Sequence, residues 1–104
     1  MARAHAAVES EDLPRLRELL DSGVDIEEVD GGLTLLQHAV DVEPDGHVQT
    51  GEPVHVDVTA YLLARGADPL KSHVDGGASA LHMARVGGRW LPVSLIGAFL
   101  ERRR

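Results

Sequence analysis

Hydrophobic residues recur at helical spacing in two segments of the chain. The two apolar stripes are Leu13, Leu16, Leu19 and Leu20, and Val58, Tyr61, Leu62 and Leu63. Residues three and four positions apart lie on one face of a helix, so each stripe predicts an amphipathic helix. Gly23 and Gly66 follow the stripes, where a helix ends and its backbone adopts a positive φ angle.

The same pattern occurs more than once along the chain. GGLTLLQHAV begins at Gly31 and GGASALHMAR begins at Gly76, 45 residues later. RELLDSGVDI begins at Arg17 and AYLLARGADP begins at Ala60, 43 residues later. Self-similarity at a period of this size is typical of repeat proteins.

Hydroxyl side chains stand where the first helix of each unit should begin. Thr34 and Ser79 can accept a hydrogen bond from a backbone N–H of the first turn. Gln37 and His82 come three residues later and can reach back to the cap. The repeating unit is therefore a capped helix, a turn, a second helix, a glycine stop and an extended connector.

TLLQHA, SALHMA and LLARGADP resemble the ankyrin repeat, whose first helix starts with TPLHxA and whose second helix ends with LLxxGAD. In the first repeat, His5-Ala6-Ala7 fits the end of the TPLHxA motif, and residues 19–25 fit LLxxGAD. The resemblance spans nearly the whole chain. It implies one domain, residues 1–104, folded as an all-α solenoid of two to three helix-turn-helix repeats. Repeat 1 covers about residues 1–30, repeat 2 about 31–75, and repeat 3 or a C-terminal cap about 76–104.

The chain departs from the ankyrin pattern at both ends. Ala2 stands where the first repeat should have its Thr cap, so we expect that helix start to fray. The last helix, about residues 91–102, lacks the Gly-Ala-Asp ending and finishes with three arginines, which favours a cap. Its apolar sequence LPVSLIGAFL either packs on repeat 2 or leaves Ile96 and Phe99 open for a dimer or partner. We favour the first arrangement.

Repeat 2 is longer than the pattern requires. Pro44, Gly46, Gly51 and Pro53 predict an irregular inserted loop of about residues 43–54 between its two helices. Insertions in repeat arrays often lie on the binding face. The segment also contains residue types that bind metals, namely Asp45, His47, Glu52, His55 and Asp57. Their spacing matches no known metal site, so we expect no metal and no cofactor.

Composition narrows the classes of function. The chain has 104 residues and no cysteine, which excludes disulfides and thiolate chemistry. Nucleophile-elbow, phosphate-loop and HExxH motifs are absent from the sequence, so we expect no enzyme. We expect no nucleic-acid partner, because the basic cluster at residues 102–104 has no binding motif beside it. The sequence has no apolar run suited to a signal peptide or a membrane span, so a cytoplasmic protein is expected. Nine of the ten basic residues are arginine, which suggests a bacterial protein.

Charge is distributed unevenly between the two halves. Residues 1–57 hold fourteen Asp and Glu against three Arg, a balance of −11, and residues 58–104 hold three acids against seven bases, a balance of +4. The acidic half favours a basic partner. Of the histidines, we expect His5 and His82 to brace helix starts and His38 to be partly exposed.

These observations predict a non-catalytic module that binds a partner protein through its connector tips, inner-helix ends and inserted loop. The candidate partner-binding residues are Glu27, Glu28, Val29, Asp30, Asp41, Val42, Glu43, Asp45, His47, Glu52, His55, Leu70, Lys71, His73, Val74, Arg85, Val86 and Trp90. An acidic module of this size fits an inhibitor or immunity-type protein that masks a basic partner. The alternative is a structural homodimer formed through the apolar C-terminal helix.

Overall fold

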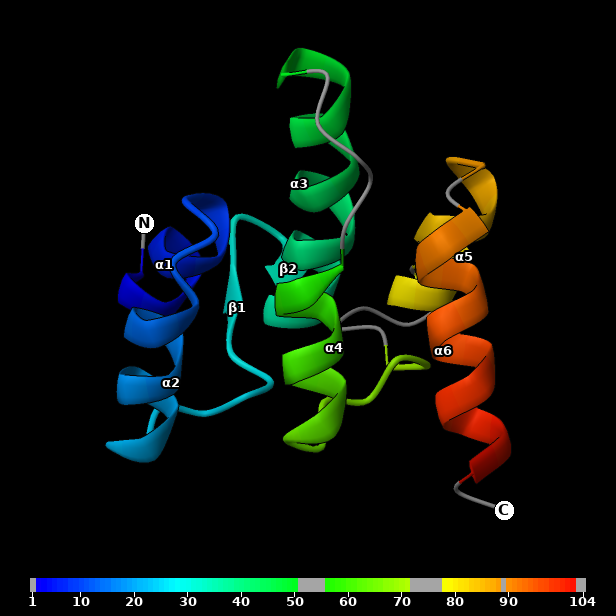
Figure 1. Ribbon diagram of the computed structural model, residues 1–104. Coiled ribbons are helices and arrows are strands. Elements are labelled where there is room, and N and C mark those ends of the chain that lie inside the picture. Colours follow the sequence, from blue (N-terminus) through cyan, green and yellow to red (C-terminus); the bar gives the residue numbers. More distant parts are fainter. Residues whose placement is uncertain (1, 51–55, 72–77, 89, 103–104) are drawn as a thin grey trace.

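The computed structural model describes residues 2–50, 56–71, 78–88 and 90–102, and within these ranges it does not describe the side chains of residues 44–50 and Trp90. The described helices and strands are α1 (Arg3–Glu9), α2 (Leu13–Asp21), β1 (Val29–Asp30), β2 (Leu33–Thr34), α3 (Leu35–Thr50), α4 (Asp57–Ala64), α5 (Ala80–Val86) and α6 (Trp90–Arg102). The described helices form three pairs, which stand side by side in chain order in Figure 1. The architecture is an all-α solenoid, as predicted.

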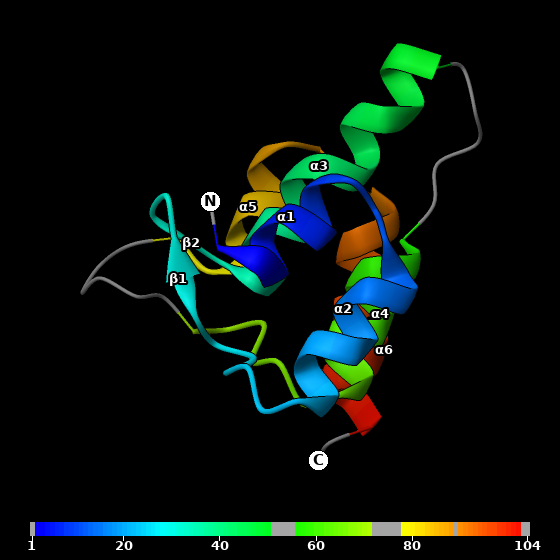
Figure 2. The ribbon, with the colours of Figure 1, turned by 90° about the vertical axis from the view of Figure 1, so that its left-hand side faces the viewer.

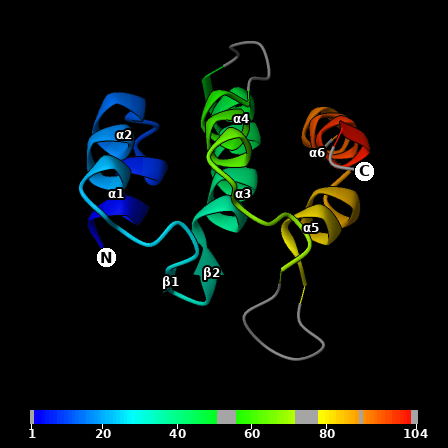
Figure 3. The same cartoon turned by 90° about the horizontal axis from the view of Figure 1, so that it is seen from below.

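The helices form two layers. Seen along the helix axes, α1, α3 and α5 lie in one layer and α2, α4 and α6 in the other (Figure 3). Each helix of the first layer packs against its own partner and against the next helix of that layer. The connector between the first two pairs forms an antiparallel hairpin, with Val29 opposite Thr34, and it projects to one side of the layers (Figure 2). Its turn is Gly31-Gly32, where φ is 62° and 82°, values that favour glycine at both positions.

The predicted helix caps are present. The Thr34 hydroxyl accepts the Gln37 N–H at 3.2 Å, while the Gln37 side chain accepts the Thr34 N–H at 2.8 Å, which is a complete capping box. The Ser79 hydroxyl accepts the His82 N–H at 3.1 Å. Helix α1 has no side-chain cap at Ala2, as its sequence implies.

The predicted glycine stops end the second helices of the first two pairs. Gly23 and Gly66 have φ angles of 109° and 102°. In each case the next residue donates its N–H back into the helix, from Val24 to the Leu19 carbonyl at 3.2 Å and from Ala67 to the Leu62 carbonyl at 3.0 Å. Both ends are therefore Schellman motifs, which satisfy carbonyls of the last turn.

A continuous apolar core runs through all three pairs. Its buried members are Ala4, Ala7, Val8, Leu16, Leu19, Leu20, Leu35, Leu36, Ala39, Val40, Val58, Leu62, Leu63, Ala67, Ala80, Leu81, Ala84 and Ile96. Both apolar stripes contribute to it. The last helix packs on the array through fully buried Ile96, whereas Phe99 is only partly buried, so the favoured packing holds for Ile96 and in part for Phe99.

The prediction of an irregular insertion at about residues 43–54 is wrong over residues 43–50. Helix α3 continues to Thr50, through Pro44 and Gly46. These residues disfavour a helix locally, yet the turn before Pro44 is fixed by core residues Ala39 and Val40 and by the buried side chain of Glu43, so the helix propagates from an anchored turn. Residues 51–55 lie outside the described part of the chain.

Candidate partner-binding groove

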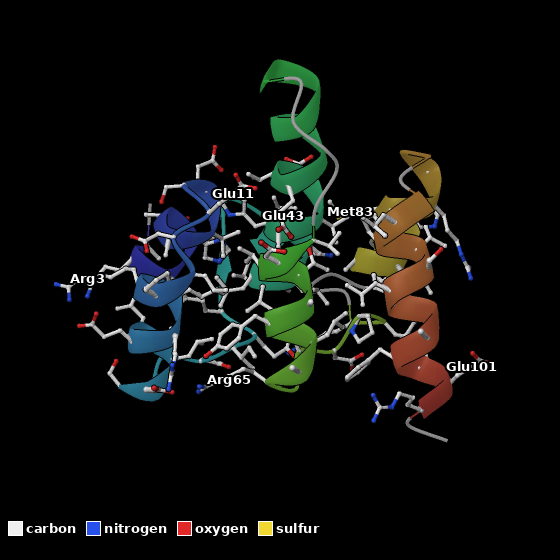
Figure 4. The ribbon with its side chains drawn as sticks, in the orientation of Figure 1. Arg3, Glu11, Glu43, Arg65, Met83 and Glu101 are labelled. Carbon is white, nitrogen blue, oxygen red and sulfur yellow. The ribbon has the colours of Figure 1, made fainter. Side chains whose placement is uncertain are left out.

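A groove of about 370 Å³ lies on the first layer of helices, where α3 packs against α5. Its lining residues are Val40, Asp41, Ala78, His82, Met83, Val86 and Gly87. Four of the seven are apolar side chains. Figure 4 places Met83 on the side of α5 that faces α3.

A buried amide holds the two walls of the groove in place. Gln37 on α3 donates from Nε2 to the Ala78 carbonyl at 2.5 Å, just before α5 begins. The same side chain completes the capping box with Thr34, and it is buried. Because both ends of the amide are used, α5 is fixed relative to α3 at the Ala78 end of the groove. Apolar and acidic side chains are left at the opposite end.

Two predicted residues meet in this groove. Asp41, near the middle of α3, and Val86, at the end of α5, both line it. Val86 is 74% exposed, a large fraction for an aliphatic side chain in a helix, and Asp41 is exposed beside it. An accessible apolar surface with one carboxylate at its edge suits an apolar side chain followed by a cation. Arg85 is exposed on α5 but does not line the groove.

Sequence reasoning missed the other lining residues, Val40, Ala78, His82, Met83 and Gly87. A signal for them was present. His82 and Val86 are spaced by four, so they lie on one face of α5, and the preceding repeat identifies that face as the one toward α3. His82 was assigned to capping, which its backbone N–H performs, while its side chain remains exposed in the groove.

The connector residues form a second, acidic group on the hairpin. Asp30 accepts the Ala2 N–H at 2.5 Å. That hydrogen bond lowers the pKa of Asp30 below its ordinary value, and the charges of the N-terminus and His5 act in the same direction. Glu27 accepts the Asp68 N–H at 2.9 Å, which ties the first connector to the second. Val29 is 47% exposed between them.

Other predicted residues are only partly accessible. Glu28 is half-buried, and its Oε1 atom is buried without a hydrogen bond from any described residue. Val42 is half-buried on α3, whereas Leu70 and Lys71 are exposed after α4, Leu70 by 57%. These positions do not join the groove.

The assignment of Glu43 to partner binding is wrong. Its side chain is fully buried and accepts hydrogen bonds from the Val58 N–H at 3.0 Å, the Thr59 N–H at 2.8 Å and the Thr59 hydroxyl at 2.6 Å. Figure 4 shows Glu43 directed at the first turn of α4. The carboxylate therefore acts as a cap for α4, which has no side-chain cap of its own at Val56.

The expected partial exposure of His38 is also wrong. His38 is 7% exposed, because its ring lies between α1 and α3 against the ring of His5.

The side chains of the remaining predicted partner-binding residues are not described by the structure. Asp45 and His47 belong to α3 by their backbone, and Trp90 begins α6, but their side chains are outside the description. Glu52, His55, His73 and Val74 lie outside the described residues altogether.

The described residues were compared with what a metal site and a membrane-spanning helix require. Among these residues, no group of three or more His, Asp or Glu side chains is arranged to hold a metal ion. The described helices include none with the length and apolar character needed to cross a bilayer. Most of the candidate metal ligands of the 41–57 segment fall where side chains are not described.

The class defined by this geometry is a helical repeat array with a groove between successive inner helices. Residues 4–40 match the family model described as ankyrin repeats (many copies). This matched segment contains α1, α2, the hairpin and the start of α3, and the next helices repeat the same arrangement. Residues 4–40 are therefore similar to ankyrin repeats. No curated protein matches it. Ankyrin repeats generally act as protein-interaction modules and are typically not enzymes.

Proposed function

We propose that this chain is a non-catalytic module that binds one partner protein in the groove between α3 and α5. The observation that carries the proposal is the apolar wall of that groove, formed by exposed Val86 and partly buried Met83, with the Asp41 carboxylate at its edge. Exposed aliphatic side chains at a concave junction are what a protein interface buries.

We infer that the partner presents an apolar side chain next to a basic one. The groove supplies the apolar contact, and Asp41 supplies the negative charge beside it. The acidic hairpin residues Glu28 and Asp30, together with the −11 balance of residues 1–57, add a field that attracts a basic protein. A cytoplasmic bacterial inhibitor or immunity-type protein that masks a basic target fits this charge and size.

The test uses a random peptide library displayed on phage and selected against the immobilised protein. We expect selected peptides to carry an aliphatic or aromatic residue beside Lys or Arg. Their binding should weaken about tenfold in Val86→Ser and several-fold in Asp41→Asn, and it should weaken as salt is raised.

Glu101→Gln is the matched control, because Glu101 is an exposed acid on α6, away from the groove. Figure 4 shows it near the far end of that helix. Equal binding to all four proteins would place the peptide site elsewhere on the molecule. A library that yields no enriched sequence would argue against a peptide-binding groove.

A second candidate function is self-association through the other layer of helices. A groove between α4 and α6 is lined by Ala60, Leu63, Ala64, Leu95, Phe99 and Arg102. It is apolar, and it extends the surface of the last helix, as a homodimer interface would require. Light scattering distinguishes the two candidates, because the dimer has twice the 11.2 kDa mass of the chain. A Leu95→Lys variant should return a dimer to that monomer mass.

A further inference from the structure

A buried polar chain crosses the junction between α1 and α3. His5 on α1 and His38 on α3 face each other, with their Nδ1 atoms 2.9 Å apart and their ring centroids 5.1 Å apart. The His5 Nε2 atom lies 3.2 Å from the Glu28 carbonyl oxygen. The His38 Nε2 atom is hydrogen-bonded to the carboxylate of Glu9, at the end of α1. His5 is fully buried and His38 almost so.

The two acceptors at the ends of this row of hydrogen-bonded groups fix the positions of two protons. The Glu28 carbonyl can only accept, so the His5 Nε2 atom must carry a hydrogen. An ionised Glu9 also only accepts, so the His38 Nε2 atom must carry one as well. Two neutral rings would then direct lone pairs at each other across 2.9 Å. One further proton between the Nδ1 atoms turns that repulsion into a hydrogen bond.

The total number of protons does not depend on where the extra one resides. If Glu9 is protonated instead, it donates to His38, whose Nδ1–H donates to His5, whose Nε2–H donates to Glu28. In both forms the group of Glu9, His38 and His5 holds one proton more than an ionised carboxylate and two neutral imidazoles. The group thus has one proton count at which every hydrogen bond is made.

The charged groups around the pair favour that extra proton. Glu9 contacts it directly, and the neighbouring connector carries Glu28 and Asp30, the latter close enough to interact with the charge of His5. On α3, Asp41 lies three residues beyond His38. The one base on α1, Arg3, points outward, away from α3 (Figure 4).

We propose that this single shared proton clamps the first repeat onto the second, so that docking of α1 and α2 is strongest near pH 6.5 and weakens on either side, with about 6.5 being the ordinary titration midpoint of unfolded histidine. In a repeat array, the terminal repeat is held chiefly by its interface with the next one. The clamp also holds the hairpin, because His5 binds the Glu28 carbonyl. It does not depend on the occupant of the α3–α5 groove.

The sign of the pH effect follows from proton counts. Two unfolded histidines hold about one proton in total at about pH 6.5, which equals the count of the folded pair. Above that pH the folded pair holds more protons than the unfolded chain, so stability falls as pH rises. Below it the unfolded chain holds more, so stability falls as pH falls. The unfolding equilibrium constant changes by up to about tenfold per pH unit on each side, the limit for one proton.

Urea unfolding of the intact protein, His38→Gln and His82→Gln between about pH 5 and pH 8.5 tests the proposal. The stability difference between the intact protein and His38→Gln should peak near pH 6.5 and decline on both sides. His82→Gln is the matched control, because His82 is an exposed histidine of the third repeat, one position before the equivalent of His38, and its curve should keep the shape of the intact protein's. Parallel curves for the intact protein and His38→Gln would overturn the proposal.

A measurement on the intact protein covers the case in which His38→Gln does not fold. At about pH 6.5, nitrogen NMR of the imidazole rings should show a hydrogen on the His5 Nε2 atom and one between the two Nδ1 atoms, with a third on the His38 Nε2 atom when Glu9 is ionised. One of these protons should resonate far downfield, as a proton between two nitrogens does. Two rings that are each protonated only at Nε2 would overturn the shared proton.

Discussion

The two junctions between inner helices use equivalent positions in opposite ways. Aligning TLLQHA with SALHMA and with the start of the chain makes His5 equivalent to Gln37, and His38 equivalent to Met83. At the α1–α3 junction these positions hold two histidines, closed by Glu9. At the α3–α5 junction they hold Gln37 and Met83, and the position of Glu9 is taken by Asp41.

The chemical difference decides which junction stays open. His38 completes a buried hydrogen-bonded chain, so the first junction is filled by polar groups that demand one arrangement. Met83 offers only a flexible apolar side chain, and Gln37 is fully used by Thr34 and Ala78. The second junction is therefore fixed at one end and accessible at the other. One junction positions the repeats, and we assign binding to the other.

The largest expected loss of stability comes from removing the side chain that joins α3, the helix shared by both junctions, to α4. Glu43→Ala removes the acceptor of three buried hydrogen bonds at the start of α4, which packs on α3. We expect the free energy of unfolding to fall by about 3 kcal/mol, because hydrogen bonds to a charged group are worth about 1.5–3 kcal/mol each and do not add fully. Urea unfolding followed by circular dichroism measures it.

Glu43→Gln separates charge from shape in the same experiment. The amide keeps one acceptor oxygen but points a donor at a backbone N–H, so roughly half the loss should remain. If both variants unfold like the intact protein, Glu43 does not cap α4, and the continuity of α3 needs another anchor.

A smaller loss of stability is expected from disrupting the α1–α3 junction alone. His5→Ala removes two hydrogen bonds and leaves the Glu28 carbonyl and the His38 ring without their partner. We expect a loss of about 2 kcal/mol at about pH 6.5. The exposed equivalent, His82→Ala, should change stability by less than about 0.5 kcal/mol. Similar losses in both variants would mean that the two junctions do not differ in the way described.

The repeat pattern predicted most of the helix boundaries and few of the buried polar contacts. Caps at Thr34 and Ser79 and stops at Gly23 and Gly66 follow from local chemistry, so the sequence shows them directly. The role of Glu43 was missed because its partners are fifteen and sixteen residues away, across a segment that contains two prolines and two glycines. Local propensity carries no information on such a contact.

The histidine pair was missed for a related reason. His5 and His38 are 33 residues apart, and each is ordinary within its own motif. Only stacking of the repeats shows that the position after Gln37 in one unit faces the His5 position of the unit before it. The groove at Met83 follows from the same stacking rule, so a repeat-by-repeat alignment of facing positions would have found both sites.

The open junction should tolerate a change that a closed one would not. Val86→Ala removes an apolar side chain that is 74% exposed, so we expect a stability change within about 0.5 kcal/mol. Val8→Ala, at a fully buried position on α1, should cost about 1–3 kcal/mol by the loss of core contacts. Thermal unfolding of the two variants at equal concentration makes the comparison. A costly Val86→Ala would mean that the groove wall carries stability and is not reserved for a partner.

The smallest effect should come from the hairpin that borders the polar junction. The Ala2 N–H lowers the pKa of Asp30, so the folded protein keeps this carboxylate ionised at a pH where the unfolded chain, with an ordinary aspartate pKa of about 3.9, binds a proton. The stabilisation is therefore present above about pH 5 and is lost as pH falls through the folded pKa. Asp30→Asn should lower the urea midpoint slightly at about pH 7 and leave it unchanged at about pH 2. A difference that persists undiminished in acid would show that Asp30 acts through hairpin shape instead of charge.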